Sequence, residues 1–298
     1  MVAGFTHKQC SVTTLMEDIA TDIFTNVSGC TRITENVPAD EYLIYYTTDA
    51  LYINIEEYIN ISGAAYSIGV KITYSSQWDT FNEIPMGTVY TTYIPVWYSN
   101  SSAAYIDTEN EQNYWRAKKF MLNYWADAYG IQMHISNSEN PEGFATAVAV
   151  MHSIEFIPTA ALEYNDGYSH IFTTFYISGT VASGVYDTSR THPFLYNGDT
   201  VNYQIPMNGY QSQLNDDVYF EFPWIYNDPG EFYLPVYRTN RWFVLDQTYT
   251  EYIPGSIITW TDGGVERKFI VCDMITYSGY PSGYVYVCIP YENAKAYA

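Results

Sequence analysis

Hydrophobic and polar residues repeat with two different periods along this chain, and the period of two covers more of it. Apolar and polar residues alternate over much of Tyr42–Ile59. Segments rich in β-branched and aromatic side chains are Tyr42–Tyr46, Leu51–Ile55, Gly69–Tyr74 and Gly87–Tyr98. Alternate residues of a strand share a face, so this pattern predicts half-buried β-strands. Pro95 lacks the N–H that a central strand needs, so the last of these strands is expected at a sheet edge or a bulge.

A period near 3.6 appears first in residues 11–25. Leu15, Ile19 and Ile23 recur there at helical spacing with acidic residues between them. This spacing predicts an amphipathic helix whose apolar stripe must pack against other protein. The chain's own sheet is the expected partner of this stripe, and a neighbouring subunit is the alternative.

The same period predicts a second helix over residues 109–129, with acidic residues in its first turn and Gly130 as its stop signal. Arg116, Lys118 and Lys119 lie inside it and make up a quarter of the chain's 12 basic residues. Two interpretations stay open for this basic cluster. The cluster either lies on a solvated helix face and pairs with the protein's own acidic residues, or it binds an acidic patch on a partner.

Strand patterns return after residue 144 and continue to the C-terminal region. The clearest hairpin has Ser256–Trp260 and Val265–Asp273 flanking the turn Asp262–Gly264, and a further strand is predicted over Tyr284–Pro290. The expected fold class is α+β and predominantly β, with antiparallel sandwich- or barrel-like units and two amphipathic helices. We expect either two domains, 1–185 with the inserted helix and 186–298, or one large domain.

The net charge excludes more classes of function than any motif does. The chain has 33 acidic and 12 basic residues and a formal net charge of −21. This charge argues against sequence-specific nucleic-acid binding and against attraction to anionic membranes, and it suits a wall that DNA passes without adhering. No apolar run is long enough to span a bilayer, and the first residues lack the pattern of a secretory signal.

Motifs of known chemistry are lacking in the sequence. No Walker loop, G-x-S-x-G or H-E-x-x-H segment occurs, so we expect no catalysis, no cofactor and no metal. A cluster of His134, His152 and His170 would need the fold to bring three strands together. The four cysteines have no C-x-x-C spacing, and they are expected to be free thiols or to form the pairs Cys10–Cys30 and Cys272–Cys288.

Tyrosine is the most distinctive residue type, with 33 copies spread over nearly every predicted strand. Tyr and Trp offer large contact area with few rotatable bonds, and they are enriched in protein interfaces. We therefore predict that Tyr93, Trp97, Tyr233 and Tyr237 contact partners, together with the two helix faces described above. A carbohydrate-binding or receptor-binding module would instead gather aromatics and carboxylates in one groove, and a glycoside hydrolase would need a carboxylate pair such as Glu56–Glu57.

The chain as a whole resembles virion structural proteins of tailed bacteriophages, of the tail, neck or baseplate type. The resemblance lies in its acidic, tyrosine-rich and strand-rich character, the helix around Leu15–Phe24 and the hairpin segment GSIITWTDGGVERKFIVCDM. It implies a subunit made in the host cytoplasm and incorporated into the virion. Such a subunit would form a homo-oligomeric ring or tube and act through contacts with other virion proteins.

Overall fold

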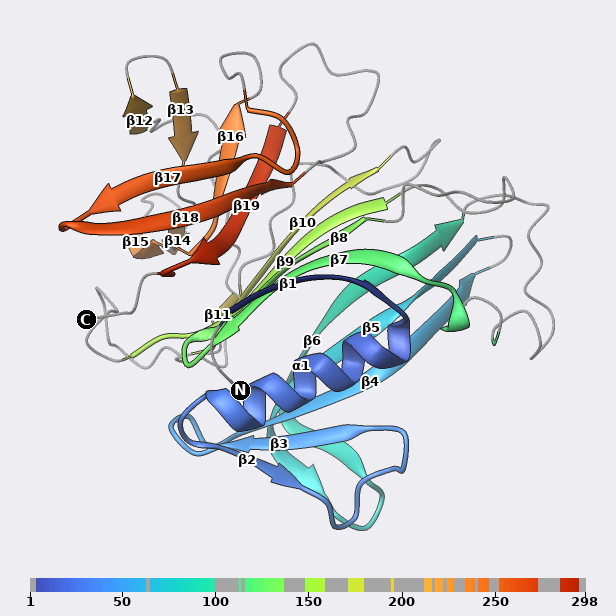
Figure 1. Ribbon diagram of the computed structural model, residues 1–298. Helices are drawn as coiled ribbons and strands as arrows, with labels where there is room; N and C mark the ends of the chain where they lie inside the picture. The colour runs from blue at the N-terminus through green and yellow to red at the C-terminus, as the bar shows by residue number, and fades with distance from the viewer. Residues whose placement is uncertain are drawn as a thin grey trace. The chain divides into compact units, whose positions relative to one another are not determined.

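A computed structural model describes part of the chain, and Figure 1 shows its elements. The described residues are 4–62, 65–99, 113, 116–136, 148–158, 171–179, 194–195, 212–215, 218–221, 224–227, 234–238, 241–246, 252–272 and 285–294. Strands dominate these residues and all strand pairs in them whose register is known are antiparallel. The expected predominantly β fold class is therefore confirmed. Within these ranges, no helix combines the length and apolarity that crossing a bilayer requires.

The elements follow one another along the chain with a single multi-turn helix near the start of the described residues. They are β1 (Gly4–Cys10), α1 (Val12–Asn26), β2 (Cys30–Ile33), β3 (Tyr42–Tyr46), β4 (Leu51–Ser62), β5 (Ala65–Asp79), β6 (Ile84–Ser99), β7 (Phe120–Asp127), β8 (Gly130–Ser136), β9 (Val148–Phe156), β10 (Ile171–Gly179), β11 (Phe194–Leu195), β12 (Ser212–Asn215), β13 (Val218–Glu221), β14 (Trp224–Asn227), β15 (Leu234–Arg238), β16 (Phe243–Asp246), β17 (Ile257–Asp262), β18 (Val265–Cys272) and β19 (Val285–Glu292).

Four sheets contain these strands. Their strand orders are β2-β3-β4-β5-β6, β1-β7-β8-β9-β10-β11, β12-β13-β16-β19-β18-β17 and β14-β15. The chain forms two compact units that are discontinuous in sequence. Unit 1 comprises residues 1–2, 8–122 and 135–148, and unit 2 comprises residues 3–7, 123–134 and 149–298. The division expected from the sequence, between residues 185 and 186, lies outside the described residues.

Unit 1 is built around α1 and the sheet β2-β3-β4-β5-β6. The helix begins at Ser11, whose Oγ accepts a hydrogen bond from the backbone N–H of Thr14 at 3.3 Å. Leu15, Ile19 and Ile23 are fully buried, and α1 packs on β2, β3, β4 and β5, along which it lies in Figure 1. The helix therefore packs on its own sheet, the first of the two partners that the sequence left open.

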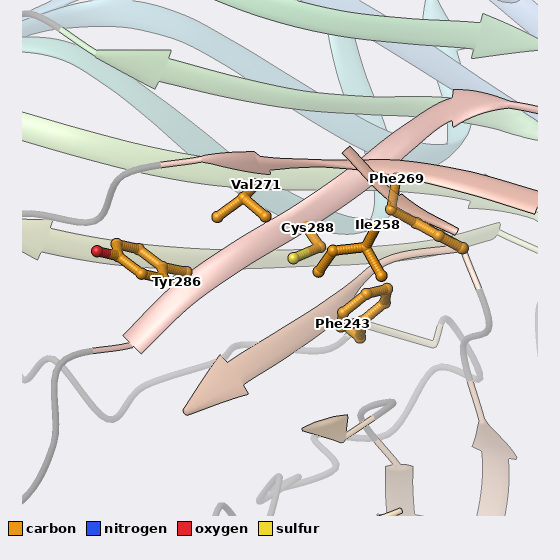
Figure 2. Packing of buried hydrophobic residues seen from close by; sticks show 6 residues of the cluster. All are labelled: Phe243, Ile258, Phe269, Val271, Tyr286 and Cys288. Atoms are coloured by element: carbon orange, nitrogen blue, oxygen red, sulfur yellow. The ribbon is translucent and has the colours of Figure 1, made fainter. Parts of the chain in front are cut away.

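Unit 2 has a core in which residues of β9 pack with residues of β18 and β19. Figure 2 shows another cluster of the same unit, in which the aromatic side chains of Phe243, Phe269 and Tyr286 pack with Ile258, Val271 and Cys288. The rings of Phe243 and Phe269 meet edge to face with centroids 4.9 Å apart, an arrangement that aromatic pairs favour. A second cluster joins β9 to this sheet through Ala149, Met151, Trp242, Cys272, Val287 and Ile289.

A buried polar network also lies in unit 2 and connects four segments. Arg241 is fully buried, and its Nη2 lies 2.6 Å from Asp127 Oδ2, while its Nε donates a hydrogen bond to Gln132 Oε1 at 3.2 Å. Gln132 Nε2 donates to Ser153 Oγ at 3.1 Å, and that hydroxyl donates to Glu155 Oε1 at 2.8 Å. A buried charge is tolerated when it is paired and hydrogen-bonded, which is the arrangement found here.

The second predicted helix, 109–129, is wrong over Phe120–Asp127, because these residues form strand β7 between β1 and β8. Residues 108–112 and 114–115 lie outside the described residues. The apolar positions of β7 satisfy a period of two as well as a helical period, and pairing on both sides favours the strand. Gly130 does not end a helix: a Cβ there would lie 2.0 Å from the backbone oxygen of Ile154, so glycine permits close approach of β8 to β9.

All four cysteines are free thiols. Cys272 and Cys288 belong to different buried clusters of unit 2, although β18 and β19 are paired strands. Cys288 is the register partner of Val271, the residue before Cys272, so the alternation of a sheet places the two cysteines on opposite faces. The pairing Cys272–Cys288 that the spacing allowed is therefore absent, and so is Cys10–Cys30.

Candidate assembly surface

Large exposed apolar side chains of the described residues gather on two hairpins, one in each unit. The hairpin β5–β6 carries Phe81, Ile84, Met86, Val89 and Tyr93, and the region of hairpin β17–β18 carries Ile253, Ile257 and Val265. Strands β6 and β17 each stand at the end of their sheet's strand order. We call the first set, with the rest of β6, the β6 edge. Apolar side chains on open edges mark contact surfaces, because soluble monomers usually protect such edges with charge.

The backbone of the β6 edge has a defined hydrogen-bonding direction. The N–H of Thr88 points toward β5, since it donates to Ser76 Oγ at 3.0 Å. N–H groups alternate in direction along a strand, so those of alternate residues beginning at Val89 point away from β5. Pro95 belongs to the same alternate set as Val89, so its missing N–H would also have pointed away from β5 and costs no bond between β5 and β6. Within the described residues no strand pairs with this side of β6, which leaves donors and acceptors open at Val89, Thr91 and Tyr93.

Side chains alternate along β6 in step with the backbone. Val89 is 44% exposed and Tyr93 is 46% exposed, while Thr92 and Ile94 on the opposite face are buried. Thr91 lies between Val89 and Tyr93 on the exposed face and is partly buried. The buried face belongs to the core of unit 1, so the exposed face is the one that another molecule could reach.

The tip of the hairpin is held by one carboxylate. Asp79 Oδ1 accepts hydrogen bonds from the backbone N–H groups of Phe81 at 2.8 Å and Asn82 at 3.1 Å. Hydrogen bonds from Asn82 and Phe81 lower the pKa of Asp79, so the carboxylate stays ionised and keeps these bonds. The turn therefore presents Phe81, which is 91% exposed, in a defined position.

Tyrosine pairs flank the exposed face of the same sheet. The rings of Tyr58 and Tyr93 meet edge-on with centroids 4.8 Å apart, and those of Tyr45 and Tyr52 lie 5.0 Å apart. Thr73 Oγ1 and Thr91 Oγ1 are 3.2 Å apart between the two pairs. These residues come from four neighbouring strands, β3 to β6, and share one face of the sheet, on which Thr73 itself is buried.

Charges on this face are largely paired with one another. Lys71 and Glu56, which are register partners, form an ion pair. Glu41 Oε2 accepts a hydrogen bond from Asn54 Nδ2 at 2.6 Å. Burial, with the nearby charges of Glu56 and Asp40, raises the pKa of Glu41 from 4.5 to about 7. The face can therefore change its charge near neutral pH at Glu41.

The second exposed hairpin, β17–β18, lies in unit 2. Its turn uses Gly263 and Gly264 at φ 57° and 81°, conformations that glycine adopts without steric cost. Ile257 is exposed while its neighbour Ile258 is buried in the core cluster of Figure 2. This edge thus repeats the pattern of the β6 edge over a shorter strand.

Several residues predicted to contact partners are buried instead. Leu15, Ile19 and Ile23 are enclosed between α1 and its sheet, and Trp97 is 1% exposed. Their apolar surface is used in the core of unit 1. Tyr93 is exposed at the β6 edge. Tyr237 is in β15 as the register partner of Ile225, and Tyr233 lies outside the described residues.

The basic cluster is partly paired within the chain. Arg116 Nε lies 2.8 Å from Glu57 Oε2, as the first of the two interpretations expected. Burial raises the pKa of Glu57, and the guanidinium of Arg116 opposes that rise. Lys118 is partly buried and Lys119 is exposed. Whether these lysines meet an acidic partner stays a prediction.

The described residues that were considered for catalysis and metal binding do not come together in one site. Glu56 and Glu57 are consecutive residues of β4 and so point to opposite faces of the sheet. His134 and His152 are buried, and burial lowers the pKa of His152 to about 3. Within the described ranges no three His, Cys, Asp or Glu side chains are placed to hold a metal ion. His170 lies outside those ranges.

Sequence reasoning missed most of the β6 edge. It named Tyr93 but not Phe81, Ile84, Met86 or Val89. One signal could have found them: β6 has 16 residues without a single charge, in a chain with 45 charged residues among 298 (12 basic plus 33 acidic). An uncharged strand that also contains prolines is an edge strand without the usual charged protection.

Comparisons with known proteins add no relative. No family model, curated protein or solved structure matches this chain. The function is therefore inferred from the surface itself.

Proposed function

We propose that this protein is a structural subunit of a virus particle of the tailed-bacteriophage type, located in the tail, neck or baseplate. It acts through self-assembly and contacts with other virion proteins. The observation that carries the proposal is the gathering of exposed apolar residues on the hairpin β5–β6 and in the region of hairpin β17–β18, whose strands β6 and β17 stand at sheet ends. Such edges favour pairing with other chains, which a protein that works alone would avoid.

The charge distribution supports the same function. A net charge of −21 keeps free subunits soluble and repels the phosphates of DNA. Strand β6 carries none of that charge. An acidic body with one uncharged edge strand, β6, suits a subunit that associates through that edge and leaves nucleic acid unbound.

The test is the copy number of the chain in particles of the virus that encodes it. Purified particles should contain the protein in a fixed number of copies that matches a ring or tube symmetry, measured by quantitative mass spectrometry with labelled peptides. Antibodies against the chain should mark the tail, neck or baseplate in electron micrographs. Absence of the chain from purified particles would refute the proposal.

A second candidate, a carbohydrate-binding or receptor-binding module, is favoured by one observation. Tyr45 and Tyr52, Tyr58 and Tyr93, and the polar residues between these pairs share one face. Aromatic rings with nearby carboxylates are what saccharide recognition requires. A glycan array followed by thermal unfolding tests this candidate, because a ligand that binds the folded state raises Tm with concentration. Binding that survives Tyr58→Ala would argue against this face.

A further inference from the structure

We infer that β6 pairs with β6 of a second copy of this chain, in antiparallel orientation, about a two-fold axis at Thr91. This inference rests on the proposed assembly function and names the partner of one of its edges. In this arrangement Thr91 of one copy lies opposite Thr91 of the other, and Val89 lies opposite Tyr93.

The backbone supports this register. The N–H groups of Val89, Thr91 and Tyr93 point away from β5, as the Thr88 hydrogen bond and Pro95 both indicate. Residues of an antiparallel pair that face each other in this way exchange both hydrogen bonds. Centring the pair on Thr91 uses these three residues of each copy and forms about six backbone hydrogen bonds. Pro95 falls at the end of the ladder, where its missing N–H matters least.

The exposed side chains match themselves under this symmetry. Val89 and Tyr93 are exposed on the same face of β6 and would form two aromatic–aliphatic cross-strand pairs, one on each side of the axis. Thr91 would meet its own copy, and threonine pairs are favourable in this position. The exposed sequence around Thr91 therefore complements itself.

Charge explains why the occupant is a second copy. Two molecules of net charge −21 repel one another, so they can approach only where charge is absent. Strand β6, Ile84–Ser99, has no charged residue. It therefore provides no ion pair for a partner of opposite charge. Lys71 and Glu56 are charged residues on the adjoining strands and already pair with each other. Lys71 would lie about 20 Å from its copy, three strand spacings across the sheet and four residues along it, beyond the screening length at physiological salt.

The first test places charge on the axis. Thr91→Lys and Thr91→Glu should each raise the dissociation constant of the dimer at least about tenfold, since like charges then face each other. An equimolar mixture of the two variants should recover dimer, because lysine then faces glutamate. Mass photometry and sedimentation velocity across concentration measure these populations, and far-UV circular dichroism checks that each variant is folded.

Thr259→Lys is the matched control, since Thr259 is an exposed threonine on the other edge strand, β17. The inference expects Thr259→Lys to leave the dimer intact. Equal loss of association in both lysine variants would instead indicate head-to-tail pairing of β6 with β17 and overturn the two-fold inference. A wild-type chain that stays monomeric at every concentration would overturn it as well.

A second test fixes the register by cross-linking. Facing residues of a hydrogen-bonded pair have Cα atoms about 5.5 Å apart, within the range of a disulfide. Thr91→Cys should therefore cross-link to itself on mild oxidation. Val89→Cys should not, but it should cross-link to Tyr93→Cys when the two variants are mixed. Cross-linking of Val89→Cys to itself would place the axis elsewhere and reject this register.

These outcomes separate the inference from the proposed function. If virions contain the chain and Thr91→Lys assembles like the wild type, the β6 pairing is wrong while the structural role stands. If the dimer behaves as expected but virions lack the chain, the pairing stands and the structural role fails.

Discussion

Arg241 brings a positive charge into the core of unit 2, where Asp127 and Gln132 are its partners. Arg241→Leu removes the cation and leaves the carboxylate of Asp127 buried without it. We expect a loss of about 3–5 kcal/mol in the free energy of unfolding, measured by urea denaturation. Trp125 and the backbone of Tyr129 still donate to Asp127, which favours the lower end of this range.

The exposed pair Lys268–Glu292, 2.7 Å apart, provides the control for that substitution. Lys268→Leu breaks an ion pair that water already solvates, so we expect no comparable loss of stability. Similar losses in both variants would contradict the idea that burial gives the Arg241–Asp127 pair its importance.

Glu41 makes stability depend on pH. Its pKa is raised from 4.5 to about 7 in the folded state, so the fold favours the protonated form. The stability associated with that proton is present below about pH 4.5 and is lost as pH rises through 7. Glu41→Gln should therefore equal the wild type near pH 4 and exceed it above pH 7, by about 1 kcal/mol after allowance for solvent screening.

Urea denaturation at several pH values measures this difference. Glu35→Gln removes one negative charge from an exposed position and controls for net charge. A Glu41→Gln variant that gains no stability between pH 4 and pH 8 would show that Glu41 is not held in its protonated form.

At the scale of elements, α1 contributes to unit 1 through its buried stripe. Ile19→Ala removes a fully buried side chain between the helix and the sheet. We expect a loss of about 2–5 kcal/mol in the free energy of unfolding, because the cavity collapses only in part. Thr13→Ala changes an exposed residue of the same helix and should cost less than about 0.5 kcal/mol. Comparable losses in both would argue against this packing.

The elements differ in how far the sequence could predict them. The helix over residues 11–25 and the strand Tyr42–Tyr46 were predicted almost to the residue, because the first follows the helical period and the second is rich in aromatic residues. The helix 109–129 was predicted wrongly over Phe120–Asp127, where the apolar residues fit both periods. Local pattern is ambiguous there, and the neighbouring strands β1 and β8 decide the outcome.

At the scale of the whole molecule, the four cysteines are expected to behave as one class. Burial raises the pKa of Cys10 and Cys30 to about 12, and that of Cys288 well above 9. Thiolates are the reactive form, so the native protein should react slowly with Ellman's reagent at pH 8. In denaturant without reductant, all four thiols should react at once. Fewer than four would reveal a disulfide and contradict the free state.

The sequence predicted the type of the candidate surface, an aromatic contact surface, but not most of the residues that form it. Abundant tyrosine indicated contact surfaces, and Pro95 indicated an edge strand near Tyr93. Trp97 belongs to the same segment, yet it is buried because a bulge near Ile68–Gly69 shifts the register of β6 against β5. Such a shift changes the face of every residue beyond it, and sequence alternation alone does not reveal it.

The sequence by itself determined the strand-rich class, the apolar stripe of α1, the acidic charge and the uncharged strand at the β6 edge. These features depend on residue type and short-range periodicity, which are local properties. The tertiary structure decided that the stripe packs inward, that residues 120–127 form a strand and that Phe81, Val89 and Tyr93 stay exposed. Burial depends on which distant segments come together, so no local pattern can determine it.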